Sequence, residues 1–146
     1  MIEKLDALTG AWRSEGETVD DPVVRIEGSD VYEWLPGRYF LVHHVDVTID
    51  GRRYQALEVF GAEGDAVVAR AYDSDGETGT MTVRADEAGV VTLTGPASRA
   101  RLIVAGDGAS MAARWDRRDD AGEWRHWMDM RFTRADERRS PAAATP

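Results

Sequence analysis

Residues 40–60 read FLVHHVDVTIDGRRYQALEVF, and they hold two segments rich in β-branched and aromatic residues. Between the segments lies Asp50-Gly51, a dipeptide that favours a two-residue turn of the primed type between antiparallel strands. A two-residue turn fixes the register of the hairpin. The predicted pairs on one face are Ile49 with Arg52, Val47 with Tyr54, Val45 with Ala56, His43 with Glu58, and Leu41 with Phe60.

The opposite face of this hairpin is more polar, because it pairs Asp46 with Gln55 and Thr48 with Arg53. We therefore predict that the face with His43 and Glu58 points into the protein core. A bulge in either strand would shift this register.

The same alternation of short strand-like segments and turns continues along nearly the whole chain. Turn signals built from Gly, Pro and Asp recur about every ten residues, which is typical of an all-β sandwich or barrel. The strands predicted from this spacing cover residues 11–18, 23–34, 39–49, 52–60, 66–73, 77–85, 90–94, 98–105, 109–117 and 123–134.

An open meander of these strands would leave two unpaired edges, and closure into a barrel removes both. We predict an all-β fold, a single ten-stranded antiparallel up-and-down β-barrel over residues 1–134. Such a barrel is wider than an eight-stranded one, so its width allows space that side chains do not fill completely. Ile2, Leu5 and Leu8 predict a short N-terminal helical turn across one opening. Residues 135–146 have little to bury and are predicted to be a disordered tail.

Composition narrows the function classes. The chain has 146 residues, no cysteine and a net charge of -9, which disfavours nucleic acid and anionic membranes as partners. The N-terminus lacks the apolar core of a signal peptide, so we expect a cytoplasmic protein. A secreted protein whose signal peptide had been trimmed off would show the same N-terminal sequence. Either a monomer or a homodimer is compatible with the sequence.

Several motifs carry a resemblance to a known family. They are LTGAW at residues 8–12, DVYEWLPG at 30–37, FLVH at 40–43, ALEVFG at 56–61 and YDSDG at 72–76. Together they resemble uncharacterised bacterial lipocalin-like proteins of the calycin superfamily, over about residues 5–134. The resemblance implies a barrel with a cavity but no established activity. It also implies that Trp12 plugs the barrel base and that Arg131 or Arg134 packs across it by a cation–π contact.

Nitrobindins and fatty-acid-binding proteins are more distant members of the same superfamily. Nitrobindins bind haem through a histidine of the final strand, and His126 lies in the final predicted strand. However, the glycine-rich run that follows their tryptophan is absent after Trp12. We therefore expect no cofactor, with haem as a less favoured alternative. No metal site is expected either, since His43 and His44 are adjacent on a strand and point to opposite faces.

The candidate ligand site centres on the predicted pair of His43 and Glu58. A buried carboxylate beside an imidazole must be bonded to it, and the pair would then serve as a polar anchor for a ligand, as a general base oriented by an acid, or as structure only. A four-residue loop at Asp119–Gly122 would pair Trp115 with His126 and Met111 with Met130. The other predicted lining residues are Tyr32, Trp34, Tyr72, Met111, Trp115, His126, Met128 and Met130.

These observations favour a module that binds a small hydrophobic or aromatic molecule inside the barrel. One alternative is a small enzyme of the cyclase or isomerase type, with His43 as general base and Glu58 as its orienting acid. Another is a structural or interaction protein whose barrel is filled by its own side chains.

Overall fold

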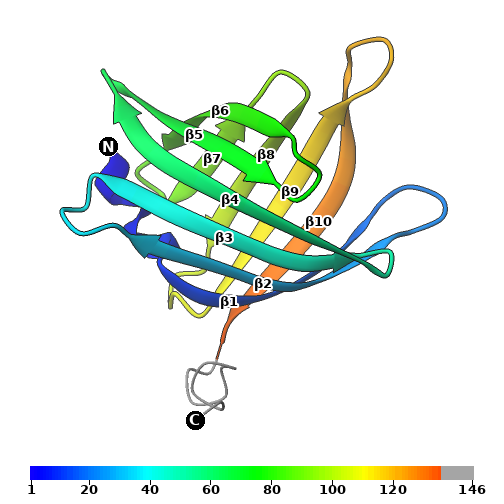
Figure 1. Ribbon diagram of the computed structural model, residues 1–146, viewed down its shortest axis with the longest axis horizontal. Coiled ribbons are helices and arrows are strands. Elements are labelled where there is room, and N and C mark those ends of the chain that lie inside the picture. Colours follow the sequence, from blue (N-terminus) through cyan, green and yellow to red (C-terminus); the bar gives the residue numbers. More distant parts are fainter. Residues whose placement is uncertain (136–146) are drawn as a thin grey trace.

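The computed structural model describes residues 1–135 and forms one closed barrel of ten antiparallel strands (Figure 1). Each strand pairs with its neighbours in sequence, and β1 pairs with β10 to close the barrel. The predicted fold is confirmed. The strands are β1 (Gly10–Thr18), β2 (Arg25–Trp34), β3 (Phe40–Ile49), β4 (Arg52–Glu63), β5 (Ala66–Asp73), β6 (Thr78–Ala85), β7 (Val90–Thr94), β8 (Ser98–Val104), β9 (Ser110–Arg118) and β10 (Trp124–Arg134).

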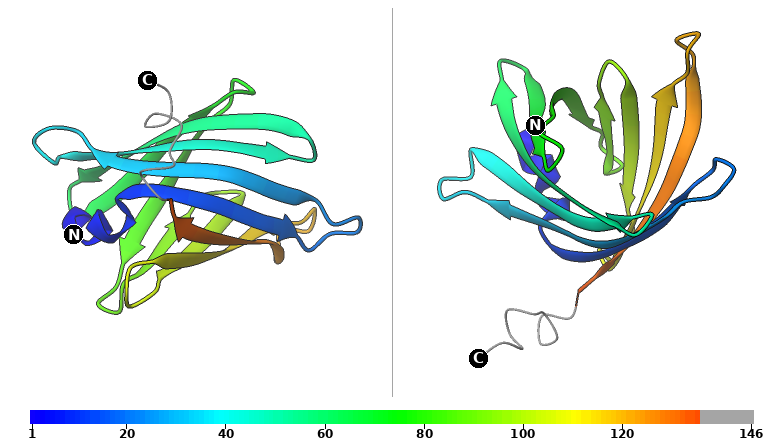
Figure 2. Two further views of the ribbon diagram at one scale, coloured as in Figure 1. Left: turned by 90° about the horizontal axis from the view of Figure 1, so that it is seen from below. Right: turned by 45° about the vertical axis from the view of Figure 1, so that its right-hand side comes forward.

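The N-terminal turn is a 3₁₀ helix, η1 (Ile2–Leu8), and it lies at one end of the barrel (Figure 2). It buries Leu5 and Leu8, as the spacing of its apolar residues predicts. Directly after it, Trp12 is fully buried and donates a hydrogen bond from Nε1 to the carbonyl oxygen of Leu8 at 2.8 Å. We call this end of the barrel the closed end. The predicted tail lies, from residue 136 on, outside the described residues.

Arg134 completes the closed end. Its guanidinium carbon lies 3.8 Å from the centroid of the Trp12 ring. The same guanidinium donates hydrogen bonds to the backbone oxygens of Ala7, Thr9 and Gly108. Of the two arginines predicted to cover Trp12, Arg134 is therefore the correct one. Arg131 is exposed and lies 3.9 Å from Glu15.

The hairpin of β3 and β4 has the predicted register at every pair, including His43 with Glu58. Asp50 and Gly51 have φ values of 52° and 77°, the positive values that a primed turn requires. The inward face is also as predicted, since Leu41, His43 and Phe60 are all buried.

The hairpin of β9 and β10 differs from the prediction. Its connection, Asp119–Glu123, has five residues rather than four, because the Asp119 carboxylate accepts hydrogen bonds from the backbone N–H groups of Ala121 and Glu123. A bulge then inserts one extra residue between His126 and Met128.

The two changes alter the pairing in β9 and β10. Trp115 pairs with Met128, and Met111 pairs with Phe132. His126 pairs with Asp116 and faces outward, so the prediction that it lines the interior beside Met128 is wrong.

Side-chain packing differs between the two ends of the barrel. Near the closed end the inward side chains are fully buried, among them Leu41, Phe60, Val67, Val83 and Val91. Towards the other end, the open end, Ile26 and Val47 are buried, but several other inward apolar side chains are only partly buried. They include Val45, Ile49, Tyr54, Met81, Trp115 and Met128. Among the inward side chains named here, those of the closed half are thus more deeply buried than most of those in the open half.

Candidate functional site

A chain of polar side chains crosses the inner wall where the two halves meet. His43 lies between two carboxylates: its Nε2 is 2.6 Å from Oδ1 of Asp30 on β2, and its Nδ1 is 3.0 Å from Oε1 of Glu58 on β4. Both His43 and Asp30 are buried, and the Glu58 side chain is only 15% exposed. We call these three residues the carboxylate–imidazole cluster.

Two neighbours hold the cluster in place. Ser14 of β1 donates its hydroxyl hydrogen to Oδ2 of Asp30. The ring of Tyr32 stacks on the imidazole of His43, with centroids 3.9 Å apart and an angle of 8° between the planes. The cluster and these two neighbours come from four adjacent strands, β1 to β4, and their hydrogen bonds and stacking hold the side chains in place.

Sequence reasoning predicted His43, Glu58 and Tyr32 but missed Asp30 and Ser14. A signal for Asp30 was present, because it lies two residues before Tyr32 and side chains two apart on a strand share a face. An acid on the inward face of a strand demands a buried partner.

The charge of His43 follows from this geometry. Burial by itself lowers the pKa of His43, but the hydrogen bonds to Asp30 and then Glu58 outweigh it and raise the pKa to about 9. At neutral pH the ring is therefore an imidazolium that donates from both nitrogens. Such a ring has no lone pair with which to accept a proton, so the geometry argues against His43 as a general base.

Two polar atoms of this region have no hydrogen-bond partner among the described residues: the second carboxylate oxygen of Glu58, Oε2, and the hydroxyl of Tyr32. Every fully buried side-chain nitrogen or oxygen in the described part of the chain does have a partner. Both atoms must therefore be reachable by solvent. Since the two side chains point inward, the space that reaches them is the barrel interior.

The wall beside Glu58 leaves room for such a space. Glu58 pairs with Ala71, and Ala71 pairs with Gly79, so the row of inward positions continues with residues that have almost no side chain. A Cβ atom added to Gly79 would meet no heavy atom within 4 Å. Met81, two residues further along β6 on the same face, and Trp115 of β9 are both partly buried.

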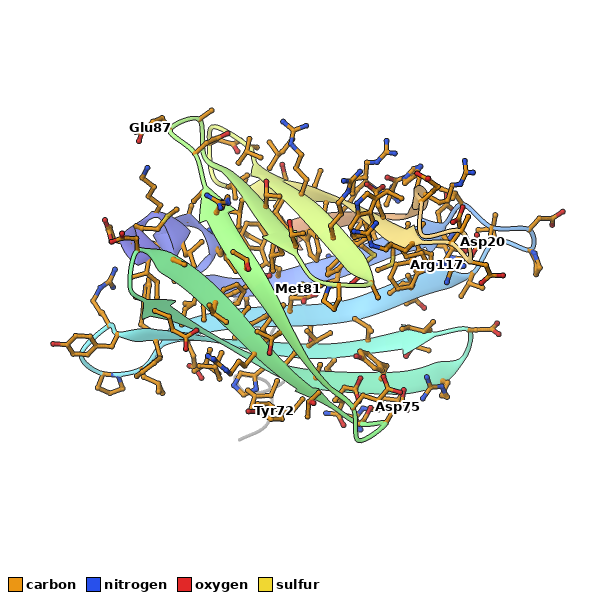
Figure 3. The ribbon with its side chains drawn as sticks, turned by 90° about the horizontal axis from the view of Figure 1, so that it is seen from above. Asp20, Tyr72, Asp75, Met81, Glu87 and Arg117 are labelled. Atoms are coloured by element: carbon orange, nitrogen blue, oxygen red, sulfur yellow. The ribbon has the colours of Figure 1, made fainter. Side chains whose placement is uncertain are left out.

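The remaining predicted lining residues are divided among three places. Met111 and Met130 point inward and are buried in the packed core. Trp34 belongs to the closed end, where its Nε1 donates to Asp6 of η1 at 2.9 Å. Tyr72 is 52% exposed on the outside of the barrel, as Figure 3 shows, so its predicted inward position is wrong.

Tyr72 faces outward because it pairs with Leu57, which lies on the opposite face of β4 from Glu58. His126 is also outside, where its Nε2 lies 2.8 Å from Oδ1 of Asp129. A histidine that faces away from the interior does not fit a haem ligand inside the barrel.

Two hollows of the described residues lie away from the cluster. One, of about 500 Å³, lies on the outer face of β2 to β5 and is bordered by His44, Leu57 and Tyr72. The other, of about 300 Å³, adjoins Met1 and Glu63. Neither of these hollows lies inside the barrel, so the interior space is inferred from the partial exposure of its lining.

Other possible sites are limited. Within residues 1–135, no group of three or more His, Cys, Asp or Glu side chains is arranged to hold a metal ion. The same residues include no helix that is long and apolar enough to span a membrane.

Comparison with known proteins identifies the fold. No family model and no curated protein matches the chain. The crystal structure of Rv2717c from M. tuberculosis is 14% identical, with a TM-score of 0.67 over 92% of this chain and 97% of that one. The S-type phycobiliprotein lyase CPES from Guillardia theta is 11% identical, with a TM-score of 0.63 over 92% of each chain.

A third similar structure is a de novo designed fluorescence-activating β-barrel. It is 12% identical, with a TM-score of 0.50 over 92% of this chain and all of that one. At these identities the likeness concerns the fold alone, a closed antiparallel β-barrel.

Proposed function

We propose that the protein binds a small, largely apolar molecule in the open half of the barrel, in contact with Glu58 and Tyr32. The observation that carries this proposal is the pair of unpartnered polar atoms on these two residues, which face an interior lined by partly buried apolar side chains. Binding sites for small molecules are mostly apolar, with a few polar groups that orient the ligand.

Two of the similar structures support the proposal by analogy. One is named as a lyase acting on phycobiliproteins and another as a fluorescence-activating barrel, so barrels of this general shape do serve small-molecule functions. In this chain Glu58 would make the polar contact to the ligand, because both nitrogens of His43 are already hydrogen-bonded to carboxylates.

The test uses Nile red, an uncharged dye that fluoresces in apolar surroundings. We expect saturable binding to the wild-type protein. Gly79→Val should weaken binding at least about tenfold, since its side chain would project into the open space beside Ala71 and Glu58. Thr80→Val, on the outer face of the same strand, is the matched control and should leave binding unchanged.

The outer hollow provides the competing result. Tyr72→Ser removes a large apolar side chain from its border. If the dye bound there, Tyr72→Ser would abolish binding and Gly79→Val would not, and the proposal would be wrong. Absence of binding to the wild-type protein would also reject it.

A further inference from the structure

The carboxylate–imidazole cluster is not electrically balanced. With both carboxylates counted as anions and the imidazole as a cation, its formal charge is -1. The imidazolium lies closer to Asp30 than to Glu58, at 2.6 Å against 3.0 Å. Asp30 also receives the hydroxyl hydrogen of Ser14, whereas Glu58 receives hydrogen bonds from His43 alone among the described residues. The excess negative charge is therefore concentrated at Glu58.

No arginine or lysine of residues 1–135 forms an ion pair with Glu58 or Asp30. Two arginines near the open end are engaged with acids: Arg52 pairs with Asp75, and Arg117 pairs with Asp20. Figure 3 shows Asp20, Asp75 and Arg117 at the same end of the barrel. An uncompensated carboxylate in a partly dry interior is costly unless a cation or a strong donor meets it.

The loops at the open end carry charge of the same sign. They comprise residues 19–24, 50–51, 74–77, 95–97 and 119–123, and none of them contains Lys or Arg. Their acidic residues are Asp20, Asp21, Asp50, Asp75, Glu77, Asp119, Asp120 and Glu123. Arginines stand at the strand ends next to these loops, among them Arg25, Arg52, Arg118 and Arg125. The rim as a whole therefore carries both signs of charge, and the inference rests on Glu58 itself.

Tyr32 supplies the second polar group of the site. Its side chain is 4% exposed, yet its hydroxyl has no partner among the described residues. The stacking of Tyr32 on His43 places this hydroxyl beside the cluster. Burial, followed by the charges of Asp30 and Glu58, raises the pKa of Tyr32 well above its usual value, so the hydroxyl stays neutral and offers a hydrogen bond.

We propose that the ligand of this barrel carries a protonated amine or another cationic nitrogen, which donates to Oε2 of Glu58. The inference rests on the proposed function, because it concerns the same interior site. It also specifies that a carboxylate-headed molecule of the same apolar shape binds poorly, since its charge would face Glu58.

The experiment compares three probes that share one ring system: 1-naphthylmethylamine, 1-naphthylmethanol and 1-naphthoate. Binding to the wild-type protein is measured by calorimetry at pH 7. We expect the amine to bind at least about tenfold more tightly than the alcohol, and the naphthoate to bind most weakly. An alcohol that binds as tightly as the amine overturns the inference.

Two variants test which carboxylate causes the preference for the amine over the alcohol. Glu58→Gln keeps the shape and removes the charge, so the ratio of amine to alcohol affinity should fall to within about twofold of one. Glu33→Gln removes one charge from the outer face, where the Glu33 side chain is 65% exposed, and should preserve the ratio. An equal loss in both variants would trace the preference to the overall charge of the protein and would contradict the inference.

A measurement on the wild-type protein covers the case in which Glu58→Gln does not fold. The amine should shift the side-chain carboxyl ¹³C resonance of Glu58 and leave that of Glu33 in place. Unchanged Glu58 signals with bound amine would reject the inference. If neither Nile red nor any naphthyl probe binds, the proposed function fails; if the uncharged probes bind without any preference for the amine, only the inference fails.

Discussion

At the scale of single residues, the position of His43 between Asp30 and Glu58 decides what this site can do. An imidazole that accepts a proton during a reaction needs a free nitrogen, and here each nitrogen is bonded to a carboxylate. The same bonds fix the ring, which in turn supports the stacked ring of Tyr32. His43 is thus a positioning residue for the two side chains that would contact a ligand.

The raised pKa of His43 predicts how stability depends on pH. Because the pKa is about 9 in the folded protein and 6.5 in the unfolded chain, the stabilisation is complete below pH 6.5 and is lost as the pH rises through 9. The free energy of unfolding should fall by on the order of 3 kcal/mol between pH 6 and pH 9.5. Urea denaturation at a series of pH values measures this fall in the free energy of unfolding.

The controls for this pH profile are two substitutions of histidine. His43→Gln should remove most of the decline, because glutamine does not titrate. His126→Gln, on the outer face, should keep the wild-type slope. A His43→Gln profile parallel to that of the wild type would show that other groups cause the decline.

At the scale of secondary-structure elements, the length of each connection determined what could be predicted from the sequence. Asp50-Gly51 forms one well-defined turn, so the pairing of His43 with Glu58 followed directly from it. The connection Asp119–Glu123 admits several conformations, and the bulge before Met128 has no sequence signal as strong as Asn-Gly or Asp-Gly. The outward position of His126 could not be foreseen for this reason.

Arg134 and Arg131 offer a matched test of how β10 seals the closed end. Arg134→Met removes the contact with the Trp12 ring and the hydrogen bonds to three backbone oxygens, which should cost about 2–4 kcal/mol of stability. Arg131→Met removes only a long, exposed ion pair and should change stability by less than about 0.5 kcal/mol. Urea denaturation of the two variants gives both values. Equal losses of stability in the two variants would show that the contacts of Arg134 at the closed end add no stability of their own.

At the scale of the whole molecule, the inward side chains of the closed half are more deeply buried than most of those in the open half. The spacing of turns was enough to predict ten strands and their closure, because each short turn pairs the two strands that it joins. The amount of interior space depends on the summed volume of side chains from all ten strands, including the small residues Ala71 and Gly79. No local sequence pattern determines this summed volume, so the amount of interior space could not be predicted from the sequence.

The uneven packing predicts uneven protection against hydrogen exchange. Backbone amides near Leu41, Phe60 and Trp12 should exchange most slowly, because their side chains are fully buried. Amides of β5 and β6 near Ala71 and Gly79 should exchange faster and should become protected when a naphthyl amine binds. Exchange measured by mass spectrometry tests both statements. Uniform protection along β5 and β6 would contradict the division into two halves.

The seal formed by η1, Trp12 and Arg134 has a kinetic consequence. With one end of the barrel occluded, a molecule held inside must leave by the same mouth through which it arrived. Arrival and departure then cross a common barrier, and a substitution at the mouth accelerates or slows both steps by the same factor. Residues at the open end would accordingly set the residence time of a ligand, whereas contacts deep inside the barrel would set its equilibrium affinity.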